Sequence, residues 1–163
     1  MITLKPTPLT HADFAPYGDV IDFAGETHYA INQGYAERFH DLADIDAAAE
    51  NGTPIISLFR GKPRPKPIVI DMMERHPLGS QAFYPLQDRD WLIVVADPQL
   101  PLDATTLRAF HATGRQGVNY MRNVWHFPLL VLEPFSEFLI VDRKGPGNNL
   151  EEAAIAEKVL VDF

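Results

Sequence analysis

Trp-Leu-Ile-Val-Val-Ala at residues 91–96 is the stretch that decides the expected fold. It combines aromatic and β-branched residues, which favour strands, and it is apolar at every position rather than at alternate ones. Because side chains along a strand point alternately to opposite faces, both faces of this strand must be covered. The stretch therefore indicates a double-layered β structure, or a strand with one face covered by a partner subunit, which also predicts a dimer.

Similar short β-rich runs occur on both sides of this stretch, separated by Gly, Pro, Asp or Asn, which are typical turn residues. They occupy residues 55–60, 67–76, 80–85, 106–112, 118–121, 129–132 and 138–142. Closely spaced short strands with few helical segments are typical of barrels and sandwiches. The sequence therefore predicts an all-β barrel, built as a double-layered jelly roll, with one or two short peripheral helices.

The expected helical segments lie outside these runs. Thr10, with Asp13 three residues later, predicts the N-cap of a short helix. Residues 43–51 contain several good helix formers and end in Asn-Gly, so a second short helix is expected there. A helical turn over residues 151–157 followed by an edge strand at 158–163 completes the prediction.

Composition restricts the class of protein. A chain of 163 residues with 46% hydrophobic and 22% charged residues suits one globular domain covering residues 1–163. The N-terminal residues show no signal-peptide pattern and no apolar run approaches the about 20 residues that span a bilayer, so a cytoplasmic protein without membrane contact is expected. The net charge of −8 disfavours nucleic acid as a partner, and zero Cys excludes thiolate metal sites and Cys nucleophiles.

The first candidate for chemistry is Glu74-Arg-His-Pro-Leu-Gly-Ser-Gln-Ala-Phe-Tyr-Pro85. If residues 67–76 form a strand, alternation places five side chains on one face: Ile68, Ile70, Met72, Glu74 and His76. After the Pro-Leu-Gly turn, Gln81 and Phe83 share a face of the next strand. Burial of each unpaired polar group costs roughly 1–3 kcal/mol, so mutual hydrogen bonds, a metal or a polar ligand should compensate.

A second candidate stretch, residues 114–128, follows a predicted strand and has Gly at two turn positions. It ends in Trp125 and His126, just before another apolar run. Two His-bearing strand ends about fifty residues apart can bring polar groups into one barrel mouth. Because both histidines would lie at that mouth rather than in the packed layer, their replacement is expected to leave the fold intact.

These residues carry a resemblance. The spacing Glu74-x-His76-x-x-x-x-Gln81 resembles the first cupin motif, and His126 stands where the second motif supplies its remaining His. Longer phrases between about Leu9 and Asp142 are similar to the ureidoglycolate lyase family. These phrases are Phe14–Ile21, Ile31–Gly34, Glu37–Leu42, Glu74–Phe83, Thr106–Phe110, Gln116–Tyr120 and Arg122–His126.

The resemblance implies a cupin-like β-barrel, a homodimer, and cleavage of (S)-ureidoglycolate to glyoxylate and urea in allantoin (purine) catabolism. Where metal-dependent cupins place His, His, Glu and His, this chain has Glu74, His76, Gln81 and His126. Two imidazoles and a carboxylate can hold a divalent metal such as nickel, but Gln is a poor ligand. We therefore expect weak metal binding by Glu74, His76 and His126, and chemistry without a metal remains open.

The implied reaction needs a base for the hydroxyl proton, an acid for the leaving nitrogen and a site for the carboxylate of the small-molecule substrate. Glu74, His76 and His126 are the candidate acid and base, in either assignment. Arg38, Arg60, Arg108 and Arg122 are candidate carboxylate partners. The other expected substrate contacts are Asn32, Asn119 and Tyr120 for the ureido group, with Gln81, Phe83 and Trp125.

Three histidines lie outside the shared phrases and are expected at the surface or in packing: His11, His28 and His111. Two rival functions stay open. One is a metal-dependent cupin that hydrolyses ureidoglycolate with release of ammonia, and the other is a cupin that binds an acidic metabolite without catalysis.

Overall fold

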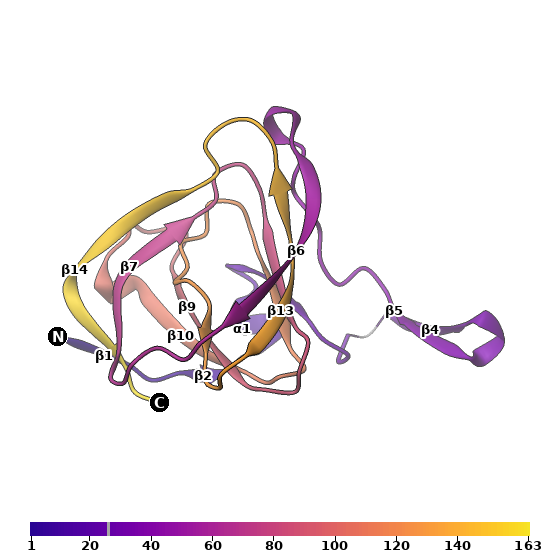
Figure 1. Cartoon of the computed structure of the whole chain (residues 1–163), viewed down its shortest axis with the longest axis horizontal. Coiled ribbons are helices and arrows are strands. Elements are labelled where there is room, and N and C mark those ends of the chain that lie inside the picture. The colour runs from indigo at the N-terminus through magenta and orange to yellow at the C-terminus, as the bar shows by residue number, and fades with distance from the viewer. Residues whose placement is uncertain (26) are drawn as a thin grey trace.

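The computed structural model describes residues 1–25 and 27–163 (Figure 1). Almost all of its regular structure is β, as predicted. The strands are β1 (Ile2–Leu4), β2 (Thr7–Pro8), β3 (Gly18–Ile21), β4 (His28–Ile31), β5 (Ala36–Phe39), β6 (Thr53–Gly61), β7 (Ile68–Arg75), β8 (Gln81–Pro85), β9 (Trp91–Ala96), β10 (Leu107–Ala112), β11 (Gly117–Tyr120), β12 (Leu130–Val131), β13 (Ser136–Lys144) and β14 (Glu151–Val161). The helical elements are α1 (His11–Phe14) and the short 3-10 segments η1 (Asn32–Gly34), η2 (Ala49–Asn51) and η3 (Ala104–Thr106).

The strands form a cupin-like β-sandwich of separate sheets. The strand orders are β3-β11-β8-β13-β6, β12-β9-β10-β2 and β1-β14-β7, and β4 pairs only with β5. Backbone bridges from His126 to Glu74 of β7 and to Val95 of β9 connect the second and third of these sheets. Within the described ranges the strands do not close into one continuous barrel.

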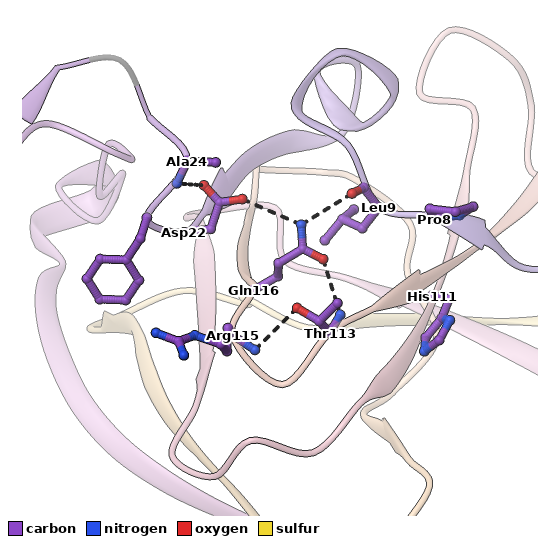
Figure 2. Close-up of a pocket in the computed structure, with 9 residues that line it drawn as sticks. Pro8, Leu9, Asp22, Ala24, His111, Thr113, Arg115 and Gln116 are labelled. Atoms are coloured by element: carbon purple, nitrogen blue, oxygen red, sulfur yellow. Dashed lines mark hydrogen bonds between the residues drawn. The ribbon is translucent and has the colours of Figure 1, made fainter.

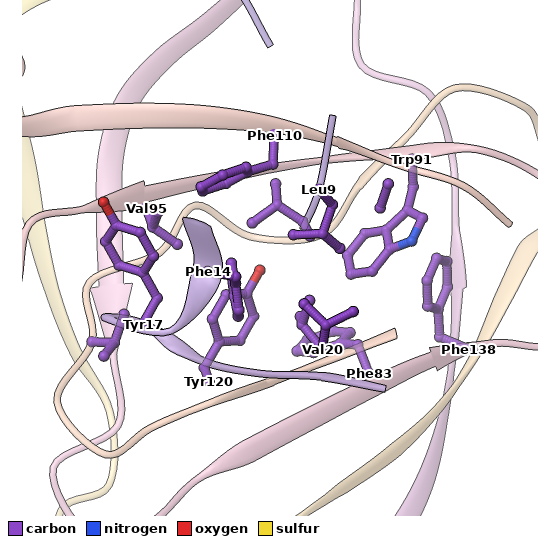
Figure 3. Packing of buried hydrophobic residues seen from close by; sticks show 14 of the residues in the cluster. Leu9, Phe14, Tyr17, Val20, Phe83, Trp91, Val95, Phe110, Tyr120 and Phe138 are labelled. Atoms are coloured by element: carbon purple, nitrogen blue, oxygen red, sulfur yellow. The ribbon is translucent and has the colours of Figure 1, made fainter. Parts of the chain in front are cut away.

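Strand β9 lies between two hydrophobic cores, and all of its residues are buried. Trp91, Ile93 and Val95 pack into an aromatic core with residues of α1, β3, β8, β10 and β13 (Figure 3). The alternate residues Leu92, Val94 and Ala96 pack into a second core with β7 and β14. The double-layered prediction is confirmed. Because the chain itself covers both faces, β9 gives no argument for a dimer.

The short helix after Thr10 is confirmed, since the Thr10 side chain accepts a hydrogen bond from Asp13 N. The helix predicted over residues 43–51 is wrong, because only η2 at its end is helical. Tertiary contacts override the helix propensity there: Asn119 Nδ2 donates to the carbonyl of Asp44 at 2.8 Å, and Asp46 N donates to Ser80 Oγ at 2.8 Å. These bonds hold the segment against the five-stranded sheet.

The tail prediction is also wrong. Residues 151–157 belong to β14, and this strand is central rather than at an edge, because it pairs with β1 on one side and β7 on the other. Its irregular register between Ala154 and Val159 faces β7. Beside such a bulge strict alternation fails, and Met73 rather than Met72 is fully buried. Among the described residues, no helix is long and apolar enough to cross a membrane.

Candidate active site

Glu74, His76 and His126 come together, as the two motif stretches predict. Glu74 is near the end of β7, His76 follows that strand, and His126 lies in the segment that bridges β7 and β9. Glu74 Oε1 is 3.5 Å from His126 Nε2, and the two imidazole centroids are 5.3 Å apart. The group lies at the junction of two sheets, where a backbone bridge fixes the positions of Glu74 and His126 relative to each other.

His126 has a buried nitrogen without a partner. Its Nδ1 lies 2.9 Å from the carbonyl of Val124, which can only accept, so Nδ1 donates to that carbonyl and Nε2 faces Glu74. Nε2 is buried and makes no hydrogen bond with any described residue. The ring is 1% exposed and stacks on Tyr120 at 4.2 Å with an interplanar angle of 8°. The prediction that His126 lies outside the packed layer is therefore wrong.

His76 is held in the opposite way, with both ring nitrogens engaged. Gln81 Nε2 donates to Asp142 Oδ2 at 3.1 Å, which turns the amide oxygen of Gln81 towards His76 Nε2 at 3.0 Å. His76 Nδ1 lies 2.8 Å from the carbonyl of Asn149. Since both facing atoms are acceptors, His76 can act towards them only as a hydrogen-bond donor.

Asp142 is a site residue that the motif analysis missed. It orients Gln81 and, through Gln81, His76. A signal was present in the sequence: in the predicted strand 138–142, alternation places Asp142 on the same face as Phe138 and Ile140, and both of these are buried. A carboxylate at the end of an apolar face has the same pattern that drew attention to Glu74.

Glu74 remains a carboxylate at neutral pH. Burial raises its pKa, but the neighbouring imidazole of His126, with His76 and Arg64, outweighs burial, so the pKa of Glu74 lies below its ordinary value of 4.5. Burial and the charge of Glu74 act on Tyr120 in the same direction and raise its pKa, so the phenol keeps its proton. The cluster therefore combines a carboxylate, a buried ring nitrogen without a hydrogen bond and an imidazole held by two acceptors.

Glu74 and His76 open into a cleft of about 620 Å³, and His126 lies buried directly behind Glu74. The cleft is large enough for a small metabolite. Strand β6 and the segment after His126 form its apolar walls. The lining residues are Leu58, Phe59, Arg60, Gly61, Glu74, His76, Gln81, Phe83, Pro128, Leu129 and Leu150. Gln81 and Phe83 thus take the predicted place beside the histidines.

Other predicted contacts lie behind the cleft or away from it. Tyr120 lies behind His126 in the aromatic core. Asn119 points to the opposite sheet face, because neighbours on a strand alternate, and it lines a separate pocket there. Trp125 packs on the second core, beneath the guanidinium of Arg75 at 4.5 Å.

Of the four candidate arginines, Arg60 lines the cleft, whereas Arg38 and Arg122 are not brought to it within one chain. Arg122 makes a bidentate pair with Asp46, at 2.9 and 2.6 Å. Arg38 and Asn32 belong to the β4–η1–β5 hairpin, which extends away from the sheets (Figure 1). No hairpin residue lines the cleft in the described part of the chain.

A second pocket, of about 410 Å³, lies beside β2 and the end of β10 (Figure 2). Its carboxylate, Asp22, is 2.9 Å from His11 Nε2 and also accepts from Ala24 N at 3.0 Å. Gln116 closes the group by donating to the carbonyl of Leu9 at 3.2 Å. These polar groups satisfy one another, so we place the chemistry in the cleft around His126.

Comparisons with known proteins agree with this geometry. The family model described as ureidoglycolate lyase matches residues 1–162. A ureidoglycolate lyase of Burkholderia mallei (strain NCTC 10229) is 54% identical over 98% of this chain and 93% of its own length. Ureidoglycolate lyase 1 of Rhizobium meliloti (strain 1021) is 57% identical over 91% of this chain and 87% of its own, and the ureidoglycolate lyase of Pseudomonas syringae pv. syringae (strain B728a) is 51% identical over 94% and 91%. The chain belongs to the ureidoglycolate lyase family.

Proposed function

We propose that this protein is a ureidoglycolate lyase that cleaves (S)-ureidoglycolate to glyoxylate and urea in allantoin (purine) catabolism. The observation that carries the proposal is the buried, unpaired Nε2 of His126 beside the Glu74 carboxylate. Leaving a buried acceptor unpaired costs about 1–3 kcal/mol, so such an atom points to a group that binds there. Family membership identifies the substrate class.

The reaction moves one proton from oxygen to nitrogen. Ureidoglycolate carries a hydroxyl and a ureido nitrogen on the same carbon. When the hydroxyl loses its proton, its oxygen forms the aldehyde carbonyl, the carbon–nitrogen bond breaks, and the departing nitrogen takes a proton to give neutral urea. No oxidant, reductant or water is consumed, so a base and an acid on two sides of the substrate are sufficient.

His126 suits the role of base, because its free Nε2 can accept the hydroxyl proton. Glu74 then stabilises the imidazolium that forms, by the same logic as the carboxylate of a catalytic triad. His76 suits the role of acid, because the Asp142–Gln81 pair and the Asn149 carbonyl hold it as a donor. The two rings are close enough to act on one small molecule.

The predicted metal site is compatible with the side chains present but not preformed. One donor atom each from Glu74, His76 and His126 lies within 4.8 Å of the others. His126 Nε2 is free, whereas His76 Nε2 would have to leave Gln81. We therefore propose weak binding of a divalent ion such as nickel, which would supply a Lewis acid for the substrate oxygens.

The proposed substrate contacts divide into two groups. Gln81 and Phe83 would touch the substrate directly and Tyr120 would support His126 from behind, whereas Asn119, Trp125 and Arg122 would act only through the surrounding structure. Arg60 lines the cleft but forms an ion pair with Glu137 at 2.9 Å. Arg38 and Asn32 lie away from the cleft of their own chain, so they can contact a substrate only in the cleft of a second copy. We also propose that the protein is a cytoplasmic homodimer.

The proposal is tested by incubating the protein with ureidoglycolate before and after chelation and measuring the products. Glyoxylate and urea in equal amounts are expected in both cases. Ammonia in place of urea would show amide hydrolysis, and binding without turnover would show a metabolite-binding cupin. Either of these results would overturn the lyase assignment.

A further inference from the structure

We propose that the β4–β5 hairpin of one copy, here called the arm (residues 28–39), closes the catalytic cleft of a second copy and brings Arg38 to the substrate carboxylate. The inference rests on the proposed function for the identity of that carboxylate. It adds a residue that the cleft needs and its own chain does not supply. The proposal also states that a second copy of this chain covers the mouth of the cleft.

The arm has no sheet of its own chain to pack on. Among the described residues, strands β4 and β5 pair only with each other, and Figure 1 shows the hairpin extending away from the sandwich. An isolated two-stranded hairpin is marginally stable in water. Its tip also holds Asn32 and Gln33 at φ of 53° and 57°, a left-handed conformation that non-glycine residues rarely adopt. Both features indicate a segment whose ordered form is completed by another surface.

The two faces of the arm differ. One face packs within the chain: Phe39 stacks on His28 at 5.1 Å and meets Phe23 edge-on at 4.9 Å, and His28 pairs with Glu37 at 2.7 Å. The other face consists of two cross-strand pairs, Tyr29 with Arg38 and Ile31 with Ala36.

Tyr29 on this second face is 45% exposed, and Arg38 makes no hydrogen bond or ion pair with the residues that the structure describes. The second face thus presents an apolar stripe ending in a cation with no partner among those residues. This combination matches an anionic ligand in an apolar-walled cleft.

Among the described residues, the cleft of one chain has no arginine that is free of other partners. In the described part of the chain, the nearby arginines are committed to other groups. Arg60 pairs with Glu137, Arg75 with Glu151, and Arg64 lies over the Phe127 ring at 4.5 Å. A carboxylate substrate beside the Glu74 carboxylate needs a positive partner, because like charges at close range repel. The arginine on the second face of the arm meets that need.

The receiving surface is the exposed part of edge strand β6. Ile56 and Leu58 are 71% and 69% exposed, and Leu58 also lines the cleft. The chain leaving the arm crosses the same sheet, since Leu42 and Ile45 line a pocket with Val141 of β13, the neighbour of β6. Ile56 and Leu58 pair with Val141 and Leu139, so their side chains lie on this same outer face, and Leu58 stands where the face meets the cleft. The arm and the receiving strand are therefore accessible from one side, as a two-fold contact requires, because each copy must both give an arm and accept one.

A cysteine cross-link tests the contact without reference to activity. The chain has no native cysteine, so the double variant Arg38→Cys/Leu58→Cys has only the two introduced thiols. Mild oxidation should convert it to a disulfide dimer of twice 18.3 kDa on a non-reducing gel. Glu37→Cys/Leu58→Cys, with its arm cysteine on the opposite face, is the matched control and should remain largely monomeric on the gel. Equal cross-linking of both variants, no cross-linking, or a cross-link within one chain would overturn the proposal.

Subunit complementation tests the function of the arm. Arg38→Ala and His76→Ala should each be weakly active alone. When the two are refolded together, mixed dimers should contain one intact site, so activity should return to about a quarter of the wild-type value for random pairing of two subunits. No recovery in a mixture shown to contain mixed dimers would place Arg38 in its own subunit's chemistry or outside it. If wild-type protein does not turn over ureidoglycolate, the cross-link still decides whether the arm binds a second copy.

Discussion

The cleft around His126 and the pocket around Asp22 (Figure 2) contain the same kinds of residue but differ in how they are paired. In the Asp22 pocket, the carboxylate and His11 are 2.9 Å apart and the remaining carboxylate capacity is used by Ala24 and Gln116. In the cleft, Glu74 and His126 stand 3.5 Å apart and His126 Nε2 is left without a hydrogen bond. The closed His–carboxylate pair satisfies its own hydrogen-bonding groups, whereas the open pair leaves one ring nitrogen without a partner, and we propose that the substrate uses this nitrogen.

The largest effect is expected when the carboxylate of the open pair, Glu74, is removed. Glu74→Gln keeps the shape of the side chain but cannot stabilise an imidazolium, so turnover of ureidoglycolate should fall by about 10²–10⁴. His76→Ala should cause a loss of similar size by removing the acid. Steady-state kinetics measure both, and circular dichroism of each variant serves as the folding control. Wild-type turnover in a folded Glu74→Gln variant would contradict the assignment.

A smaller effect is expected from Asp142→Asn, since this residue acts through Gln81. An Asn can present either an oxygen or an amide group to Gln81, so the Gln81 oxygen is no longer directed only at His76. We expect turnover to fall by about tenfold, with a small change in KM. The pH profile of turnover should move as well, because His76 loses part of its support as a donor. A lower rate with an unchanged profile would indicate only a structural role.

The pH dependence of the free energy of unfolding tests the charge of Glu74 in the open pair. The pKa of Glu74 is lower in the folded protein than its ordinary value of 4.5, so the unfolded chain binds a proton there first as pH falls. The stabilisation from Glu74 should therefore be complete above about pH 4.5 and be lost as pH falls through the folded-state pKa. Denaturant unfolding between pH 7 and pH 3 should show the wild type and Glu74→Gln converging at the acidic end. A constant difference would argue against the lowered pKa.

The smallest effect is expected in the closed pairs. His11→Gln and His111→Gln should leave turnover within about twofold of the wild type, although the loss of the contacts to Asp22 and Asp90 should lower the unfolding midpoint slightly. Thermal unfolding and steady-state kinetics on the same samples provide the comparison. A hundredfold loss of turnover in either variant would move the chemistry to the pocket of Figure 2.

Strand pattern predicted most of the fold and the clustering of Glu74, His76 and His126. Alternation along residues 67–76 correctly paired Glu74 with His76, and the second His-bearing strand end correctly supplied His126. The same rule, applied fully, separates Asn119 from Tyr120, which are neighbours on β11 and cannot line one face.

Other features of the structure could not be predicted from local sequence patterns. The helix predicted at 43–51 fails because Ser80 and Asn119, distant in sequence, bind its backbone. The orientation of the His76 ring depends on the carbonyl of Asn149, which lies in a loop with no motif. The dimer argument from residues 91–96 failed because a second core within the chain covers the strand. Local periodicity specifies faces, whereas long-range partners decide what covers them.

The proposed mechanism depends on transfer of the substrate's hydroxyl proton to the unpaired Nε2 of His126. Its most direct measurement is the turnover number of His126→Gln beside that of His111→Gln, with glyoxylate and urea quantified and folding checked for each. Glutamine is preferred to alanine, because His126 is 1% exposed and stacks on Tyr120, so alanine would leave a cavity. The account predicts a loss of at least about a hundredfold for His126→Gln and almost none for His111→Gln. Equal turnover by the two folded variants would contradict it.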